Sequence, residues 1–484
     1  MSCQLFADAL ASQLADFGAG LDADINIPSA ALVSTPQTVL VSIVATNPYP
    51  SAMPVYILRQ EREGWQILKL MGALAPNSRT NLELEVELAY QKETKRNTRY
   101  TVVARGEDGR LYGKYFEISE NWEPYEKEIK DSLSSAIVTY IPALAAILVV
   151  LVIAMAKFAY GGKSQKEYDM RTLVFPDVEG KPFEEKLADV MIHPLTMLFE
   201  IICVSLLVLV LFESLSQPFG TEEALKIMLL SGVGALAIPF IYFAAAWFFD
   251  RREEGKPLRF FAGMFVWGMF AAFLSLLVSS SIVTEMKNAQ FAAYALVATM
   301  LIAPVVEEVM KGLGVLFVSG HHEYNDTLTG LLLGFTCGVG FAFVENWFYF
   351  SAKVNPFDVG LSSWGVLILY RSFFNTLAHG CFTAAVSTPI GYLRGFDKLK
   401  KYSRLAFIPG ILLAISIHTI FNLSALADGF VIASQQVPFF VFNPMLIILL
   451  AAMFFLVLVL AVIDEKKRKM ERSIKKAVDA QANA

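Results

Sequence analysis

Two adjacent glutamates and a lysine interrupt an apolar stretch of the sequence, LIAPVVEEVMKG, which begins at Leu301. A charged side chain at the centre of a bilayer costs about 2.5 to 3.5 kcal/mol on insertion scales, so such residues usually face a wet protein interior and act there. On a helix, Lys311 lies one turn after both Glu307 (i,i+4) and Glu308 (i,i+3). The lysine can therefore neutralise one carboxylate and leave the other free for chemistry, but the spacing does not show which.

Further polar side chains follow in the next apolar stretch, which ends with Glu345 and Asn346. Small residues recur every four positions between residues 330 and 342, a pattern that lets two helix backbones approach closely. The stripe predicts that Glu345 and Asn346 meet a neighbouring helix. The alternative is that Glu345 serves only as the counter-ion of Lys311 or Arg371.

Two later stretches carry histidines on polar stripes. Arg371, Asn375 and His379 are four residues apart, which places them on one side of a helix, and His418 and Asn422 repeat that spacing. Glutamates of the first stretch and both histidines lie in the middle of their stretches, so they can meet at one depth in the membrane.

These residue types suit hydrolysis of a peptide bond. An unpaired carboxylate in a dehydrated pocket is a competent general base for water, and a neighbouring histidine can share that water or protonate a leaving amine. A second histidine, with Asn422, can donate hydrogen bonds to an oxyanion. We therefore predict Glu307, Glu308, His379, His418 and Asn422 as catalytic residues, supported by Lys311, Glu345, Asn346, Arg371 and Asn375.

The composition sets the class of protein. Of 484 residues, 55% are hydrophobic, and several apolar runs exceed the length needed to cross a bilayer. We predict a polytopic all-α membrane protein with about nine transmembrane helices, at residues 135–156, 194–215, 227–249, 260–284, 290–319, 328–350, 363–388, 405–426 and 440–463. The net charge of −5 and the lack of an aromatic-interleaved basic stripe give no indication of nucleic-acid binding.

Charged loops predict the orientation. Basic residues gather after the third span, after the seventh span and in the tail that follows Lys466, whereas the alternate loops carry one lysine or none. The positive-inside rule then places the C-terminus in the cytoplasm and the N-terminus outside. If the first run did not span, the N-terminal domain would be cytoplasmic. Residues 157–193 read as an amphipathic surface segment, and residues 1–20 as part of the mature chain rather than a signal peptide.

Residues 22–119 show short runs of period-2 alternation separated by turn signals, which predicts a β-sandwich of immunoglobulin-like or fibronectin-like type. The predicted organisation is an N-terminal extramembrane β-sandwich domain with its connector, four transmembrane helices with the amphipathic loop, a protease core, and a last helix with a basic tail. The corresponding residues are 1–131, 132–289, 290–426 and 427–484.

The polar motifs of residues 290–425 resemble the PrsW family of membrane proteases, and more distantly the CAAX-processing and bacteriocin-processing glutamate proteases. The resemblance rests on Glu307-Glu308-x-x-Lys311, on the run from Phe341 to Asn346, on the stretch with Arg371 and His379, and on His418-x-x-x-Asn422. It implies an intramembrane or membrane-proximal endopeptidase with a glutamate-activated water and a membrane-anchored regulatory protein as substrate. Zinc is a possible cofactor, since Glu308, His379 and His418 match zinc ligands in number and type.

Two other functions are compatible with intramembrane charges. An ion- or proton-coupled transporter would use them as a path through the helices, but it favours internal repeats, and none is evident. A catalytically inactive scaffold would keep the fold and lose the chemistry. The turn that contains His321 and His322 is interpreted as a polar cytoplasmic turn, because no neighbouring residue in sequence completes a tetrahedral metal site.

Overall fold

A computed structural model of the chain describes residues 22–26, 37–61, 64–88, 90, 93–105, 111–160, 175–176, 179–253, 255–291, 293–426, 430–432, 435–437 and 439–482. The N-terminal segment interpreted as mature chain, and part of the segment 157–193 interpreted as amphipathic, lie outside the described residues. The chain divides into two compact units: Met1–Ser134 with Asn355–Leu361, and Ser135–Val354 with Ser362–Ala484.

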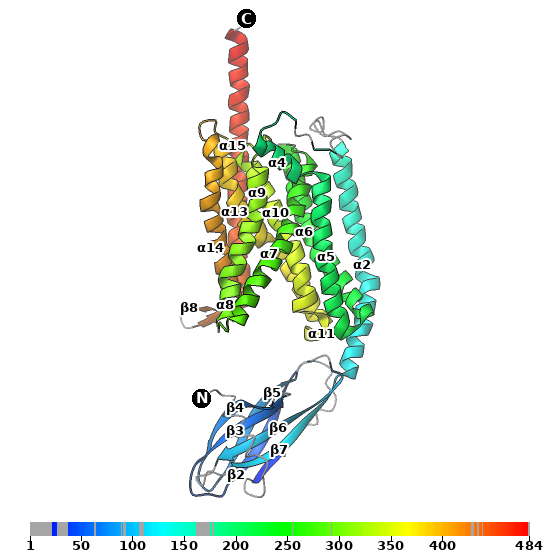
Figure 1. Cartoon of the computed structure of the whole chain (residues 1–484), viewed down its shortest axis with the longest axis vertical. Coiled ribbons are helices and arrows are strands. Elements are labelled where there is room, and N and C mark those ends of the chain that lie inside the picture. Colours follow the sequence, from blue (N-terminus) through cyan, green and yellow to red (C-terminus); the bar gives the residue numbers. More distant parts are fainter. Residues whose placement is uncertain are drawn as a thin grey trace. The chain divides into compact units, whose positions relative to one another are not determined.

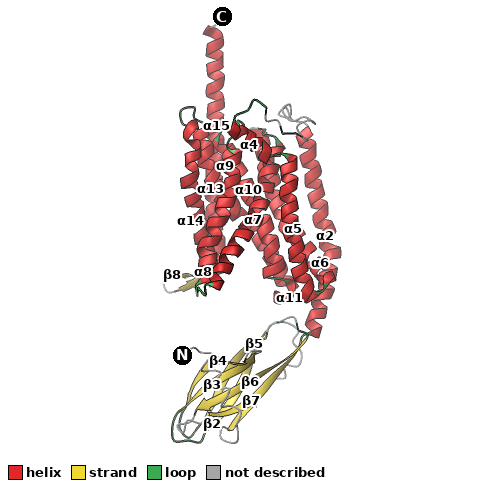
Figure 2. Ribbon diagram, in the orientation of Figure 1, coloured by secondary structure: helices red, strands yellow, loops and turns green. Residues whose placement is uncertain are grey.

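The first unit contains two antiparallel sheets, as Figure 2 shows in yellow. One sheet has the strand order β1-β2-β5 and the other β4-β3-β6-β7. The strands are β1 (Asp22–Asn26), β2 (Gln37–Asn47), β3 (Met53–Glu61), β4 (Gly64–Leu74), β5 (Ser78–Leu88), β6 (Lys95–Arg105) and β7 (Leu111–Asn121). Alternation explains the core: Val41 of β2 pairs with Leu84 of β5, and both side chains are buried. The predicted N-terminal β region is confirmed.

A short piece from late in the sequence belongs to this first unit. Helix α11 (Pro356–Val359) begins with a capping box formed by Asn355 and Asp358. The Phe357 side chain is 1% exposed, its ring lies 5.9 Å from that of Tyr90, and its carbonyl oxygen accepts a hydrogen bond of 3.0 Å from the Tyr125 hydroxyl. The β unit is therefore not built from the N-terminal sequence alone.

The second unit is helical (Figure 1). Its elements are α2 (Glu123–Tyr160), which begins in the first unit, α4 (Phe183–Met191), α5 (Pro194–Phe219), α6 (Thr221–Glu253), α7 (Leu258–Asn288), α8 (Tyr294–Val297), η3 (Ala298–Ile302), α9 (Ala303–Val318), α10 (Thr327–Phe348), η4 (Tyr349–Lys353), α12 (Leu361–Tyr370), η5 (Arg371–Asn375), α13 (Thr376–Arg394), η6 (Lys400–Ala406), α14 (Phe407–Leu426), a hairpin of β8 (Phe430–Ile432) and β9 (Gln435–Val437), and α15 (Phe439–Ala482).

Seven helices in the described part of the chain are long and apolar enough to cross a membrane, which makes the chain a multi-pass membrane protein. They comprise Glu123–Lys157, Pro194–Phe219, Thr221–Asp250, Leu258–Asn288, Thr327–Lys353, Lys400–Leu423 and Leu446–Lys467. The other two predicted spans correspond to the runs α8-η3-α9 and α12-η5-α13, which carry the charged and polar residues of interest and are less apolar for that reason. The count of nine stays a prediction.

Helix α10 lies at the centre of the helical unit, and nearly all of its side chains are buried. Its glycines allow the neighbouring helices to approach. A Cβ atom at Gly338 would lie 2.1 Å from the His379 carbonyl oxygen of α13, and one at Gly340 would lie 2.0 Å from the Phe265 carbonyl oxygen of α7. The close packing predicted from the small-residue stripe is confirmed, and it brings the end of α10 against α13.

Three π-helical segments, η3, η4 and η5, interrupt the helices around the predicted catalytic residues. Pro304 follows η3 and has no N–H to donate to the carbonyl of the preceding turn, which explains the widened register there. A π-turn rotates the side chains that follow it relative to an unbroken α-helix. The stripes that sequence spacing predicts are therefore shifted at these places.

Candidate active site

Side chains from α9, α10, η5, α13 and α14 form one buried polar cluster inside the helical unit. Glu308 and Lys311 of α9 are completely buried, and His379 of α13 and His418 of α14 are 1% and 3% exposed. The two histidine rings have centroids 5.1 Å apart. The predicted meeting of both histidines with the glutamate pair is therefore observed.

Glu308 is held through one oxygen, while its other oxygen, Oε2, is buried and makes no hydrogen bond among the described residues. Its Oε1 accepts a hydrogen bond from Lys311 Nζ at 2.5 Å and lies 2.8 Å from Nδ1 of His418. Because a carboxylate only accepts, Nδ1 of His418 carries the proton and Nε2 is left as an acceptor. The sequence predicted that the lysine would pair with one glutamate; the structure identifies that glutamate as Glu308.

Glu307 has a different environment. Its Oε2 is buried and makes no hydrogen bond among the described residues, and it lies 3.8 Å from Nε2 of His418. Its side chain is 16% exposed, unlike that of Glu308. The acceptor nitrogen of His418 and the Oε2 atom of Glu307 are thus 3.8 Å apart, a separation at which one water molecule or metal ion can contact both.

His379 is held by two charged groups. Its Nδ1 lies 3.1 Å from Nζ of Lys311, and its Nε2 lies 2.8 Å from Oε2 of Glu345. Since an ammonium only donates, Nδ1 accepts and Nε2–H donates to the carboxylate. The ring also stacks on Phe341, whose face Lys311 covers at 4.3 Å from the ring centroid.

The remaining predicted residues surround Glu345. Arg371 Nη2 donates to its Oε1 at 3.2 Å, and Asn375 Nδ2 donates to its Oε2 at 3.1 Å. Asn346 Oδ1 accepts from Arg371 Nε at 3.3 Å and from Asn375 Nδ2 at 3.1 Å. Glu345 is therefore the counter-ion of Arg371, and it also orients the imidazole of His379.

Sequence reasoning missed Tyr349, whose ring lies 3.9 Å from the guanidinium carbon of Arg371. Its position four residues after Glu345 was the available signal. Asn422 lies farther along α14 and donates a hydrogen bond of 3.0 Å to the Thr299 carbonyl of η3. Asn422 makes no hydrogen bond or ion pair with the other nine predicted residues among those that the structure describes.

Two groups of side chains have the composition and spacing of a metal site. Ligand atoms of Glu307, His379 and His418 all lie within 4.8 Å of one another, as do those of a second group, Glu185, His321 and His322. Both histidines of the first group donate their other ring N–H to a carboxylate, the arrangement that usually orients metal-bound imidazoles. The buried, unpaired Oε2 of Glu307 adds an oxygen donor. The residues therefore fit a divalent ion of the zinc type, with Glu307 in place of the predicted Glu308.

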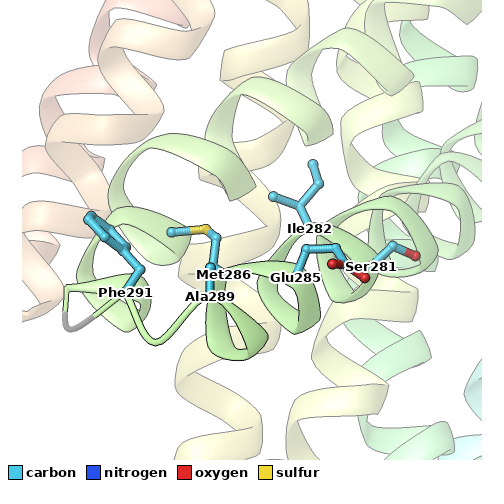
Figure 3. Close-up of a pocket in the computed structure, with 6 residues that line it drawn as sticks. All are labelled: Ser281, Ile282, Glu285, Met286, Ala289 and Phe291. Atoms are coloured by element: carbon cyan, nitrogen blue, oxygen red, sulfur yellow. The ribbon is translucent and has the colours of Figure 1, made fainter.

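A separate pocket of about 630 Å³ lies at the end of α7 (Figure 3). It is lined by Ser281, Ile282, Glu285, Met286, Ala289 and Phe291. Its lining contains a single carboxylate and no histidine, so it offers no pair of groups for general acid–base chemistry. The polar cluster, and not this pocket, is the candidate active site.

Comparisons with known proteins agree with the resemblance noted in the sequence. The family described as PrsW family intramembrane metalloprotease matches residues 256–460. No curated protein matches the chain. The solution structure of a late embryogenesis abundant protein is 13% identical over 25% of this chain and 79% of its own, with a TM-score of 0.15. A crystal structure of Escherichia coli alpha-2-macroglobulin from domain MG7 to the C-terminus is 10% identical over 84% and 66%, with a TM-score of 0.17. TM-scores this low support no argument about the fold.

The family match covers all the residues on which the resemblance rests, from Glu307 to Asn422, and extends beyond them on both sides. It also includes α7 and much of α15. Trp267 of α7 donates a hydrogen bond to the Met310 carbonyl of α9, and Ile447 and Leu450 of α15 pack against α13 and α14. Residues 256–460 are thus a PrsW family intramembrane metalloprotease domain, and the chain that contains it is a membrane peptidase.

Proposed function

We propose that this peptidase hydrolyses peptide bonds of membrane-anchored regulatory proteins, in or near the bilayer, with a water activated by Glu307. The observation that carries the proposal is the contrast between the two glutamates. Each glutamate has a buried Oε2 without a hydrogen-bond partner among the described residues. The difference is that Glu308 is already bound through Oε1 to Lys311 and His418, whereas Glu307 Oε2 lies 3.8 Å from Nε2 of His418.

Glu307 acts as the general base in this scheme. A water between Glu307 Oε2 and His418 Nε2 gives a proton to the carboxylate, and its oxygen bonds to the carbonyl carbon of the substrate. The carbon–nitrogen bond then breaks, and Glu307 returns the proton to the leaving amine. His418 holds the water through Nε2, because Glu308 keeps the ring proton on Nδ1.

Glu345 positions His379 in the same scheme. Its carboxylate is fixed by Arg371 and Asn375, and it receives the Nε2–H of His379. Lys311 joins the two halves of the site, since its ammonium contacts both Glu308 and His379. Asn422 donates to the Thr299 carbonyl, so a contribution to an oxyanion site requires that this hydrogen bond be exchanged.

If the domain holds a metal ion, as its family name indicates, Glu307, His379 and His418 are the residues that would bind it. A bound zinc ion would polarise the substrate carbonyl and lower the pKa of a bound water. Lys311 would then give up its contact with Nδ1 of His379, because a cation and a metal ion cannot share that nitrogen. Glu345 and Glu308 would keep their roles as partners of the two imidazoles.

We further propose that the C-terminus lies in the cytoplasm and the β unit outside, from the distribution of lysine and arginine among the loops. The first unit then meets the extracytoplasmic part of a substrate. Its two-sheet arrangement supports an immunoglobulin-like or fibronectin-like module that binds a partner.

The test is cleavage of co-expressed single-span membrane proteins in a host without a related protease. Wild type is compared with Glu307→Gln and Glu308→Gln at matched expression, with and without a zinc chelator. Loss of cleavage in Glu307→Gln supports the assigned base, and sensitivity to the chelator distinguishes a metal-dependent reaction from a metal-free one. Full cleavage by Glu307→Gln would refute the assignment.

A further inference from the structure

A second polar cluster lies where α4 meets the turn that follows α9, outside the active site. Glu185 belongs to α4, and His321 and His322 follow the end of α9. Ligand atoms of the three side chains lie within 4.8 Å of one another, although the residues are separated by more than 130 positions in the sequence. The fold thus supplies the further ligand that the neighbouring sequence lacks.

The exposed half of this cluster is a close pair. Nδ1 of His322 lies 2.6 Å from Oε1 of Glu185, and the His322 side chain is 47% exposed. The two imidazole rings are tilted by 30° with centroids 4.2 Å apart, so His321 and His322 present nitrogen atoms to the same small volume. His322 is exposed and the Glu185 side chain is 17% exposed, so an ion can reach this pair from the surface.

The buried half contains an unsatisfied nitrogen. His321 is completely buried, and its Nε2 makes no hydrogen bond within the described ranges. Asp189 Oδ1 lies 3.4 Å from this atom, so the two form only a long contact. It is close to the separation of about 3.3 Å expected for two donor atoms bound tetrahedrally to one zinc ion. Lys181 holds the other oxygen of Asp189 at 2.8 Å.

We infer that this cluster is a second divalent-metal site, of the zinc class, with Glu185, His321 and His322 as ligands. Asp189 lies outside this group of three but 3.4 Å from His321, and is the candidate fourth ligand. Nitrogen and carboxylate donors of this kind suit zinc better than calcium or magnesium, which prefer oxygen alone. The site is structural: it joins α4 to the end of the helix that carries Glu307 and Glu308.

Metal binding requires two local adjustments. Nδ1 of His321 accepts a hydrogen bond of 3.1 Å from the Glu323 backbone N–H, which leaves the ring proton on Nε2. Ligation of the neutral imidazole through Nε2 requires the tautomer with its proton on Nδ1, so the Glu323 contact is lost. The close pair of Glu185 and His322 also opens, from 2.6 Å to about 3.3 Å. Protons compete with the metal ion for the ligand atoms, so binding weakens as the pH falls.

The experiment uses the purified full chain in detergent with Glu307→Gln and His418→Ala, which removes two ligands of the active-site group. Zinc is titrated by isothermal calorimetry, and bound metal is counted after desalting. We expect about one equivalent of zinc, with affinity at least tenfold lower after His322→Ala or Glu185→Gln. His322 is half-exposed, so its replacement leaves the fold intact.

Glu184→Gln is the matched control. Glu184 is on the same turn of α4 but pairs with Arg404 at 2.7 Å, outside the group of candidate ligands. Its replacement is expected to leave zinc affinity unchanged. No bound zinc in the background protein, or equal affinity in His322→Ala, Glu185→Gln and Glu184→Gln, overturns the inference. Both outcomes are independent of peptidase activity.

Discussion

Replacement of Glu308 by glutamine should destabilise the helical unit, because it leaves Lys311 charged and buried without its carboxylate. Both side chains are completely buried, and Nζ lies 2.5 Å from Oε1. Removing one partner of a buried ion pair costs about 3 to 5 kcal/mol. At about 2 °C per kcal/mol for a unit of this size, the melting temperature should fall by roughly 6 to 10 °C.

The double replacement Glu308→Gln with Lys311→Met separates this effect from general damage to the site. It removes both charges and keeps an unbranched chain at position 311, so most of the lost stability should return while peptidase activity does not. The assay is thermal unfolding of purified protein in one detergent, with all four members of the mutant cycle measured together. A Glu308→Gln variant as stable as wild type, or a double variant no more stable than that single variant, would refute the reasoning.

Three further predictions concern the site and its support. Glu307→Gln should lower the cleavage rate by about 10²- to 10⁴-fold with little change in melting temperature, since this oxygen has no described hydrogen bond to lose; equal loss of stability and activity would contradict it. Gly338→Ala should reduce both stability and activity, because its Cβ would clash with the His379 carbonyl. Gly365→Ala has open space around it and should stabilise the protein by about 0.4 to 1 kcal/mol. Melting temperatures that fall in both variants would argue against this packing. Arg371→Lys should reduce cleavage, since lysine cannot contact two acceptors in one plane as the guanidinium does; cleavage at the wild-type rate would remove the assigned role.

The spacing of residues in the sequence was sufficient to predict much of the candidate active site. The four-residue intervals of Arg371, Asn375 and His379 do place all three side chains on Glu345, although a π-helical segment includes the first two. The small-residue stripe of α10 predicted the close contact with α13 because glycine spacing depends only on helix geometry. Both predictions depend only on the geometry of a single helix, and both hold in the folded protein.

Other features depend on contacts between distant segments. Lys311 is one turn from both glutamates, so only the direction of its side chain toward His379 decides that Glu308 is the paired one. Asn422 shares a stripe with His418, but the carbonyl exposed in η3 attracts its amide. No sequence pattern near His322 indicates Glu185, because α4 supplies it from far upstream. Such pairings follow from tertiary packing and not from periodicity.

The short helix α11 supplies the β unit with a core residue from a distant part of the sequence. Phe357, donated from between η4 and α12, fills an aromatic site beside Tyr90 and Tyr125. A protein shortened to begin after residue 134 would keep this phenylalanine but lose the surface that covers it, and would carry a newly exposed apolar ring in a loop. A recombinant β unit ending at residue 134 would have the opposite defect, an unfilled aromatic cavity. Truncation alone therefore yields neither half in complete form. The β unit needs residues 355–361 supplied as a linked or added peptide, and the helical unit needs those residues replaced by a polar turn.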